Sequence, residues 1–424
     1  MTPTPTTSDS QDPPRTREDA GGGSVAEAKW SVSLCDRVRD LDPARWDLLL
    51  RPEGDFYMDR RVLAGLERGL AGTARLRYAV VERDGVPVAA AVLSHFRADA
   101  SLLAEGAERH ALRFLRVVCP PLVRLNMLFC GVPVSAGQNH LRFAAEGHVD
   151  GAMRALHRTM LDEARREWAK LIVFKEFGPE ENARLGALAE LGYRRADSLP
   201  MNHAPVAPES FEAYLAGLKS RKRSVLKRSR QKFAAAGLTV EHRTGGDDTA
   251  ALFTPEVHRL YENVLDRAKV RLEHLPTGFF GELARSAGDL ARFTFVRKGD
   301  RIVAFACSAV DGHEYHQMFV GYDPTLNDEC DLYFNLFFEA VDTGFRLRPR
   351  ELSVGQSADD FKAQKLSCHQ SPLYFHVLGV DWLTKLVLKA AFPLFCPPRE
   401  SNRLAAEAYA KRLAGEVEGT PSED

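Results

Sequence analysis

Two stretches of the chain, RYAVVERDGVPVAAAVLSHF at residues 77–96 and RFTFVRKGDRIVAFACSAV at residues 292–310, decide the fold. Each has two runs rich in β-branched and aromatic residues around a short turn, Asp-Gly at 84–85 and Gly-Asp at 299–300. That pattern is typical of a β-hairpin. The hairpins resemble each other at an offset of about 215 residues, which predicts that the chain contains a duplicated unit.

The similarity between the halves continues after each hairpin. A short strand, a helical stretch and a second strand follow in both: FCGVPV (129–134), 151–168 and LIVFKEF (171–177), then FVGYDP (319–324), 331–341 and ELSVG (351–355), with Gly344 as a helix stop. A strand, a crossover helix and a strand in so short a span indicate a parallel pair within a mixed sheet. The sequence therefore predicts an α/β protein of two tandem domains of one type, each a mixed β-sheet flanked by helices.

The length of 424 residues supports this division, because compact domains usually run to about 100–200 residues. Residues 1–29 are rich in Pro, Thr, Ser and Gly and read as a disordered tail without a secretory signal, so we expect a cytoplasmic protein. The N-terminal domain should span 30–205 and the C-terminal, catalytic domain 206–380. Residues 381–424 should form a helical extension and tail.

Composition and charge exclude several classes of protein. Apolar residues make up 45% of the chain and charged residues 27%, as in a soluble globular protein. Fifty-seven basic and 58 acidic side chains leave a net charge of −1, so a polyanion could bind only at a local cluster. The seven cysteines lack C-x-x-C spacing, which predicts buried free thiols and neither a metal site nor a disulfide framework.

One such local cluster lies in SFEAYLAGLKSRKRSVLKRSRQKFAAAGLTVE, residues 210–241. Ser210 can cap a helix, Gly237 can end it, and an apolar stripe has helical spacing (Phe211, Leu215, Leu218, Val225, Phe233). Eight basic residues and no acid lie between Lys219 and Lys232. The cluster could bind a phosphate-bearing ligand or could be a solvated face. Double-stranded DNA is not expected, because no groove-reading motif accompanies the charges.

The segment DWLTKLVLKAAFPLFCPP, residues 381–398, is apolar but contains two lysines and is interrupted by Pro393. It is too short and too interrupted to span a bilayer. It predicts an amphipathic helix over 382–395, whose apolar face could pack on the protein itself, meet a partner or contact a membrane surface.

Residues that could act chemically lie on or just after three predicted strands. In LSVGQSADDFKAQKLSCHQSPLYFHV (352–377), Lys362 follows a strand that ends in Gly-Gln, where it could stabilise an oxyanion or hold a phosphate; an exposed helical lysine is the alternative. In HEYHQMFV (313–320), alternation places Glu314 and His316 on one side of a strand. Either could be a base, and His316 could equally be a hydrogen-bonded structural residue. Lys175 and Glu176 end the corresponding strand of the first half.

Taken together, these features resemble a known superfamily. The tandem halves, the basic helix followed by Gly and a strand, LYFNLFFEAV after GYDP, and VGQSADDFK are similar to the GNAT acyltransferases. Within that superfamily they resemble the tandem-domain branch, which comprises Fem-type peptidoglycan-bridge aminoacyltransferases and related bacterial N-acyltransferases. The resemblance covers approximately residues 30–380.

The resemblance implies transfer of an acyl or aminoacyl group to an amine. Phe361 and Lys362 fall where Fem-type enzymes carry an FK pair near the reacting carbonyl, which implies that Lys362 stabilises transition-state charge. Three residues fall in the helix that faces phosphate-bearing ligands in those relatives: Lys222, Arg223 and Lys227. Gln356 and Tyr333 complete the predicted substrate-binding residues, and Tyr374 could donate a proton to the leaving group.

Two departures from the family pattern concern the donor. Ordinary GNAT enzymes cradle the CoA pyrophosphate on a Gly-rich loop, whereas PTLNDECDLYF (324–334) has no glycine and three acids, and PVSAGQNH (133–140) has Gly137 alone. The charged helical hairpin of some Fem-type enzymes is also missing.

We therefore expect an N-acyltransferase that acts by direct attack in a ternary complex, without a tightly bound cofactor. The donor could be an acyl-CoA, a carrier-protein thioester or an aminoacyl-tRNA, and the acceptor a small-molecule or peptide amine. The alternative from another class is a non-catalytic protein that binds a polyanion or a partner on a decayed acyltransferase fold.

Overall fold

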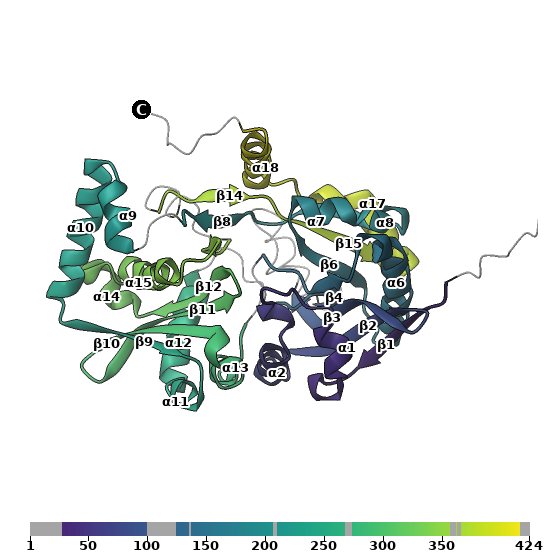
Figure 1. Cartoon of the computed structure of the whole chain (residues 1–424), viewed down its shortest axis with the longest axis horizontal. Helices are drawn as coiled ribbons and strands as arrows, with labels where there is room; N and C mark the ends of the chain where they lie inside the picture. The colour runs from purple at the N-terminus through teal and green to yellow at the C-terminus, as the bar shows by residue number, and fades with distance from the viewer. Residues whose placement is uncertain are drawn as a thin grey trace, which may run out of the picture.

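The computed structural model describes residues 28–99, 124–134, 137–206, 210–267, 274–356, 362 and 366–415. The predicted N-terminal tail lies almost entirely outside these residues. Two mixed β-sheets lie side by side with helices on their faces (Figure 1). The predicted α/β fold of two similar units is confirmed.

The first sheet has the order β1-β2-β3-β4-β6-β15-β7, with β5 paired to β3. Its strands are β1 (Trp30–Cys35), β2 (Ala74–Arg83), β3 (Val86–Asp99), β4 (Arg124–Cys130), β5 (Leu141–Phe143), β6 (Leu171–Phe177), β7 (Arg194–Asp197) and β15 (Tyr374–Gly379). The associated helices are α1 (Pro43–Asp47), α2 (Arg60–Gly69), α6 (Val149–Arg166), α7 (Pro179–Arg184) and α8 (Gly186–Glu190). As predicted, β2 and β3 form a hairpin, and α6 connects the parallel strands β4 and β6.

The second sheet has the order β14-β8-β13-β12-β11-β10-β9. Its strands are β8 (Met201–Ala204), β9 (Leu238–Thr244), β10 (Ala291–Lys298), β11 (Arg301–Asp311), β12 (Glu314–Tyr322), β13 (Glu351–Ser353) and β14 (His369–Ser371). Its helices are α9 (Phe211–Gly217), α10 (Ser220–Ala235), α11 (Asp247–Ala250), α12 (Pro255–Arg267), α13 (Phe279–Ala287), α14 (Pro324–Cys330) and α15 (Leu332–Leu347). The parallel pair β12 and β13 flanks α14 and α15, as the sequence predicts.

The two sheets exchange a strand. Each sheet has the same order from its hairpin outward, and in each the last strand but one comes from the other half of the chain: β15 lies between β6 and β7, and β8 lies between β13 and β14. Both strands cross the predicted boundary near residue 205, whose position stays a prediction. Because an inner strand loses hydrogen bonds on both sides when it is removed, neither sheet is complete without the other half.

The structure differs from the sequence prediction at two helices. The basic segment forms α9 and α10 with a break at Leu218 and Lys219, whose backbones are extended. The break shifts the helical register, so Leu226 is buried and Val225 is only partly so. The predicted stop at Gly344 is wrong, because α15 continues to Leu347. A Cβ at Gly344 would lie 2.8 Å from Leu352 Cδ1, so this glycine allows the helix to pack closely on the sheet.

One hydrophobic core crosses between the halves, where Leu63 and Leu66 of α2 pack in the same buried cluster as Phe279 and Leu283 of α13. The backbones also meet there: a Cβ on Gly312, in the β11–β12 turn, would overlap the Glu53 carbonyl oxygen. The six described cysteines are free, and three are buried: Cys130, Cys307 and Cys330. The prediction of free thiols is therefore confirmed for the six described cysteines, and the prediction that they are buried is confirmed for three of them.

Gly312→Ala should lower the free energy of unfolding by about 1–3 kcal/mol, since alanine would be strained at φ +55° and would also push the 53–54 loop away from the second half. Urea denaturation measures the loss. Gly299→Ala is the matched control, because Gly299 has φ +60° in the neighbouring hairpin and nothing within 4 Å of a Cβ. Equal losses in both variants would contradict a role for the close approach.

Candidate active site between the two halves

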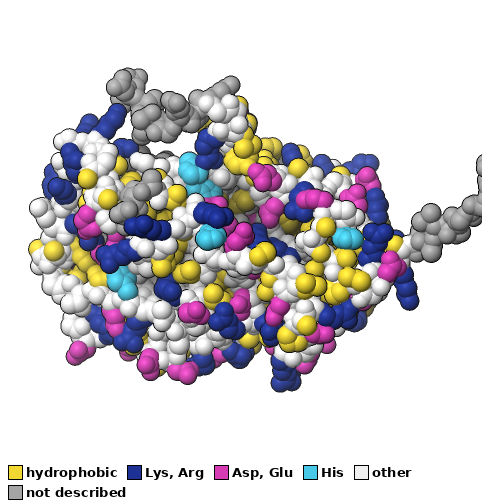
Figure 2. Space-filling model, in the orientation of Figure 1, with side chains coloured by type: hydrophobic (Ala, Val, Ile, Leu, Met, Phe, Trp, Pro, Cys, Tyr) yellow, Lys and Arg dark blue, Asp and Glu magenta, His cyan; other side chains and the backbone are white. Residues whose placement is uncertain are grey.

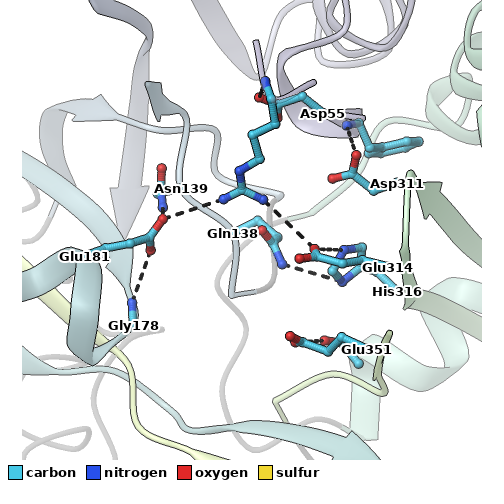
Figure 3. A network of polar contacts seen from close by, with 12 residues as sticks. Asp55, Gln138, Asn139, Gly178, Glu181, Asp311, Glu314, His316 and Glu351 are labelled. Carbon is cyan, nitrogen blue, oxygen red and sulfur yellow. Dashed lines mark hydrogen bonds and ion pairs between the residues drawn. The ribbon is translucent and has the colours of Figure 1, made fainter. Parts of the chain in front are cut away.

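Strand β12 presents a carboxylate and an imidazole toward the first half of the chain. Glu314 and His316 lie on the same side of the strand, as predicted, and Nε2 of His316 is 3.0 Å from Oε2 of Glu314 (Figure 3). Only 3% of His316 is exposed. A carboxylate bonded to one ring nitrogen orients the ring and fixes its tautomer, so the other nitrogen can accept a proton.

Residues of the first half reach this pair from the opposite side. Nε2 of Gln138 lies 3.5 Å from Nδ1 of His316, which is long for a hydrogen bond. The guanidinium of Arg51 lies 3.6 Å from Glu181 and 4.0 Å from Glu314, so it bridges acids of both halves. The site therefore needs both halves, and the contact to Gln138 is weak enough for a substrate amine to replace it.

Tyr57 forms an apolar wall beside His316. Its ring meets those of His316 and His140 edge-on, with centroids 6.2 Å and 5.4 Å apart. His140 is fully buried, and burial, with the charges of Arg142 and Lys175, lowers its pKa well below the usual value. His140 is therefore neutral, and the imidazole of His316 lies in a largely dry environment on this side.

Asp311 joins Glu314 and His316 in a set of ligand-type atoms that all lie within 4.8 Å of one another. Such a set could hold a divalent cation. The sequence did not predict it, because the three residues lie across a hairpin turn and have no metal-binding spacing. Oδ1 of Asp311 accepts a 2.7 Å hydrogen bond from the Phe56 N–H, which joins the halves again.

Lys362 is buried, with 3% exposed, and its Nζ donates a 3.0 Å hydrogen bond to the Gly355 carbonyl oxygen. The alternative of an exposed lysine is therefore wrong. A Cβ at Gly355 would lie 3.5 Å from Lys362 Nζ and 3.6 Å from the Gln317 carbonyl oxygen. The Lys362 ammonium group and the Gln317 carbonyl oxygen of β12 are thus both neighbours of Gly355.

Gln356 connects this loop to the first half. Its Nε2 donates to Glu176 Oε1 at 3.1 Å and to the Leu199 carbonyl oxygen at 2.9 Å. Glu176 also accepts from the Gly137 N–H at 2.6 Å and from the Ser198 hydroxyl at 3.0 Å. Glu176 therefore holds together the loops around the site. Lys175 donates to the Pro133 carbonyl oxygen at 3.0 Å and supports one of these loops.

The other predicted site residues lie away from this group. Tyr374 is in β15 of the first sheet, under the guanidinium of Arg195 at 4.8 Å, and no hydrogen bond of the described residues joins it to His316. Tyr333 is in α15, where burial raises its pKa to about 12. Phe361 lies outside the described residues.

The basic residues of α10 lie at the edge of the molecule, where Lys and Arg side chains gather at the left of Figure 2. Arg230 pairs with Glu339, Lys232 with Asp331, and Arg223 donates to the Ala216 carbonyl oxygen. Five cations have no ion pair within the described part of the chain: Lys219, Arg221, Lys222, Lys227 and Arg228. Their roles in ligand binding stay predictions.

Sequence reasoning missed the buried ion pair that supports the site. Asp55 accepts two hydrogen bonds from the Arg142 guanidinium, at 2.6 and 2.7 Å, and Arg142 also donates to Asn139 at 2.8 Å. Asn139 in turn donates to Glu181 at 2.6 Å (Figure 3). No periodicity relates Asp55 to Arg142. The stretch PVSAGQNH (133–140) contains Gln138 and Asn139, but it suggested a role only for its glycine.

The surroundings of Glu351, at the start of β13, predict that the free energy of unfolding depends on pH. Burial would raise its pKa, but the hydrogen bond and charge of His203, with Nδ1 2.8 Å away, together with the charge of His316 and the hydrogen bond from Ser353, lower it to about 2. Because its pKa is lowered in the folded protein, the charged carboxylate stabilises the fold at pH values above its ordinary pKa of 4.5. This contribution is lost as the pH falls toward 2.

Glu351→Gln should therefore lower the urea midpoint most at pH 5 and above, and the gap to wild type should narrow between pH 4.5 and 2. Glu329→Gln, at an exposed carboxylate, is the control. A gap that stays constant over this range would refute the assignment.

The N-terminus of α15 does not fit the pyrophosphate of CoA in the usual GNAT manner. Asn327 already accepts the Tyr333 N–H at 2.9 Å, and Asp328 and Glu329 are exposed beside it. These charges would repel a pyrophosphate. The departure noted in the sequence therefore persists in the structure.

Residues 220–363 match the family model of an acetyltransferase (GNAT) domain. Among solved structures, FemX is 12% identical, with 82% of this chain and 98% of FemX covered and a TM-score of 0.51. A tandem GNAT protein from the clavulanic acid biosynthesis pathway is 13% identical, with 83% and 99% covered and a TM-score of 0.49. The C-terminal domain of a lysylphosphatidylglycerol synthetase from Agrobacterium fabrum is 14% identical, with 84% and 98% covered and a TM-score of 0.45. No curated protein matches the chain.

Fold and site together define a protein of two GNAT-like domains with polar side chains between them. Residues 220–363 are thus similar to a GNAT acetyltransferase domain, and the fold of the chain is similar to that of FemX. No helix of the described residues is long and apolar enough to cross a bilayer.

Proposed function

We propose that the protein is an N-acyltransferase that transfers an acyl or aminoacyl group from an activated donor to an amine held between the two halves. One observation carries the proposal: the buried imidazole of His316 is bonded to Glu314 through one nitrogen and has only a 3.5 Å contact to Gln138 at the other. An amine that replaced Gln138 would lie against a nitrogen that can accept its proton.

The transfer would proceed by direct attack. The amine nitrogen bonds to the donor's carbonyl carbon, Nδ1 of His316 takes the amine proton, and the bond to the leaving group then breaks. The negative charge on the carbonyl oxygen would be stabilised by the ammonium of Lys362, which is buried beside Gly355. The leaving group would regain a proton from the imidazolium or from Tyr374, whose part stays a prediction. Glu314 would stabilise the imidazolium while it is charged.

The donor would be an acyl-CoA, a carrier-protein thioester or an aminoacyl-tRNA. GNAT enzymes in general use acyl-CoA, but the acids before α15 favour a donor whose phosphates bind elsewhere. The five exposed cations of α10 and its N-cap Lys219 are suited to this, because they have no acidic partner within the described residues. Transfer from a tRNA would be sensitive to ribonuclease and would weaken steeply with salt.

The test is mass spectrometry of products formed by the purified protein with a panel of thioester donors, aminoacyl-tRNAs and amines. We expect transfer with at least one donor, and Lys362→Met should reduce it about a hundredfold, as loss of an oxyanion-stabilising group does. Lys298→Met, at an exposed lysine, is the control. If no donor reacts, or if Lys362→Met reacts like wild type with an unchanged melting temperature, the proposal fails and a non-catalytic polyanion-binding protein is favoured.

A further inference from the structure

The helix α17 (Trp382–Phe395) covers one face of the first sheet with only a narrow part of its surface. Leu388 and Phe392 pack with Val173 of β6 and Val377 of β15. The helix α6 packs on the other face of the sheet, against residues such as Ile172. The interpretation that α17 packs on the protein itself therefore holds for Leu388 and Phe392.

The opposite side of α17 is apolar and exposed. The exposed fractions are 76% for Trp382, 52% for Leu383, 54% for Leu386 and 41% for Val387. With 3.6 residues per turn, about 100° each, these four side chains span an arc of about 140° that faces away from Leu388. A surface helix of a globular protein normally turns charged residues to this side. The fold itself leaves this apolar arc uncovered.

Trp168 extends the exposed surface. It is 82% exposed and lies just before β6, while Trp382 lies just after β15. The intervening residues tie the two ends together: Val380 N–H donates to the Lys170 carbonyl oxygen at 2.9 Å, and Lys170 Nζ lies 3.0 Å from Asp381. Both tryptophans thus lie beyond the same end of the paired strands β6 and β15. We call Trp168, Trp382, Leu383, Leu386 and Val387 the α17 patch.

The charges around the α17 patch are mainly positive. Lys385 and Lys389 are exposed on α17, and neither has an ion pair in the described part of the chain. The acid at the start of this helix already has a partner, since Asp381 pairs with Lys170.

We propose that the α17 patch rests on the surface of an anionic lipid bilayer. The tryptophans and leucines would enter the head-group region, and Lys385 and Lys389 would face the lipid phosphates. Exposed tryptophans beside lysines are typical of membrane interfaces. A second copy of the chain fits poorly, because a symmetric contact would bring like charges together. The helix would lie along the bilayer, in agreement with the absence of a spanning helix among the described residues.

The test is flotation of the full chain with vesicles of phosphatidylcholine alone and of an equal mixture with phosphatidylglycerol. We expect binding to the anionic vesicles, with a shift of tryptophan fluorescence to shorter wavelength, and little binding to the neutral ones. Lys385→Ala with Lys389→Ala should weaken binding about thirtyfold, and Trp382→Ser with Leu386→Ser at least about tenfold. These side chains are exposed, so the melting temperature should not change.

Leu413→Ser is the control, because Leu413 is 69% exposed on α18 (Glu400–Leu413), outside the α17 patch. Absence of binding to anionic vesicles would overturn the proposal, as would binding that the patch variants leave unchanged. Concentration-dependent self-association that Trp382→Ser abolishes would also overturn it and assign the patch to a contact between copies. None of these outcomes depends on acyl transfer, so the membrane proposal stands or falls separately from the proposed function.

Discussion

Replacing His316 by Ala should lower kcat/KM for acyl transfer about a thousandfold, within the range that a general base contributes. The variant would keep donor binding and Lys362 but would have no group to take the proton from the attacking amine. Steady-state kinetics measures the loss.

Two controls separate this role from a structural one. Glu314→Gln keeps a group that can hydrogen-bond to the imidazole but removes the charge, so it should cause a smaller loss of kcat/KM. His316→Asn tests packing, because it should be as inactive as His316→Ala with a melting temperature nearer to wild type. Equal activity of wild type and His316→Ala would contradict the assignment.

Treatment with EDTA should leave the wild-type rate unchanged. Loss of activity that a divalent cation restores would contradict the role of His316 as a base. It would assign His316 instead, with Asp311 and Glu314, to a metal centre.

Replacing Asp55 by Ala should lower the free energy of unfolding by about 3–5 kcal/mol, the usual cost of leaving a buried charge without its partner. The Asp55 side chain is fully buried and that of Arg142 is 7% exposed. Burial would lower the pKa of Arg142, but the charge and hydrogen bonds of Asp55 outweigh this and raise it. The guanidinium would therefore stay charged in the variant, without its main counter-charge. Urea denaturation measures the loss.

Asp47→Ala is the matched control. Asp47 also accepts two hydrogen bonds from one arginine, Arg60, at 2.9 Å each, but the side chains are 45% and 38% exposed. An exposed pair contributes about 0–1 kcal/mol. The double variant Asp55→Ala with Arg142→Met should recover part of the loss, since no unpaired charge remains. A loss at Asp55 no larger than at Asp47 would contradict the expected effect of burial.

Local patterns in the sequence predicted much of the fold and part of the site. The two hairpins, the crossover helices and the parallel pairs follow from short β-rich runs, turn residues and apolar residues at helical spacing. Alternation along one strand was sufficient to place Glu314 beside His316. The resemblance to Fem-type enzymes predicted a role for Lys362, and the structure buries this lysine beside Gly355.

Contacts between distant segments were not predictable in this way. Asp55 and Arg142 are charged residues of the kind that usually lie on the surface, and no sequence pattern marks them as a buried pair. Gln138 lies in a stretch whose only recognisable feature is a glycine. The apolar period of 382–395 predicted an amphipathic helix but did not reveal which side would meet the sheet. The helical break at Leu218 and Lys219 follows Gly217, but the basic run continues across it, so the sequence predicted a single helix.

The sequence alone determined that the chain contains two copies of one α/β unit and which strands carry the candidate catalytic residues, because strand and hairpin patterns depend on neighbours within a few positions. The tertiary structure decided that β8 and β15 change sheets, that the residues of the candidate site come from both halves, and that α17 has an uncovered apolar side. Those features depend on which surfaces meet when segments some 200 residues apart pack, and no local pattern encodes that choice.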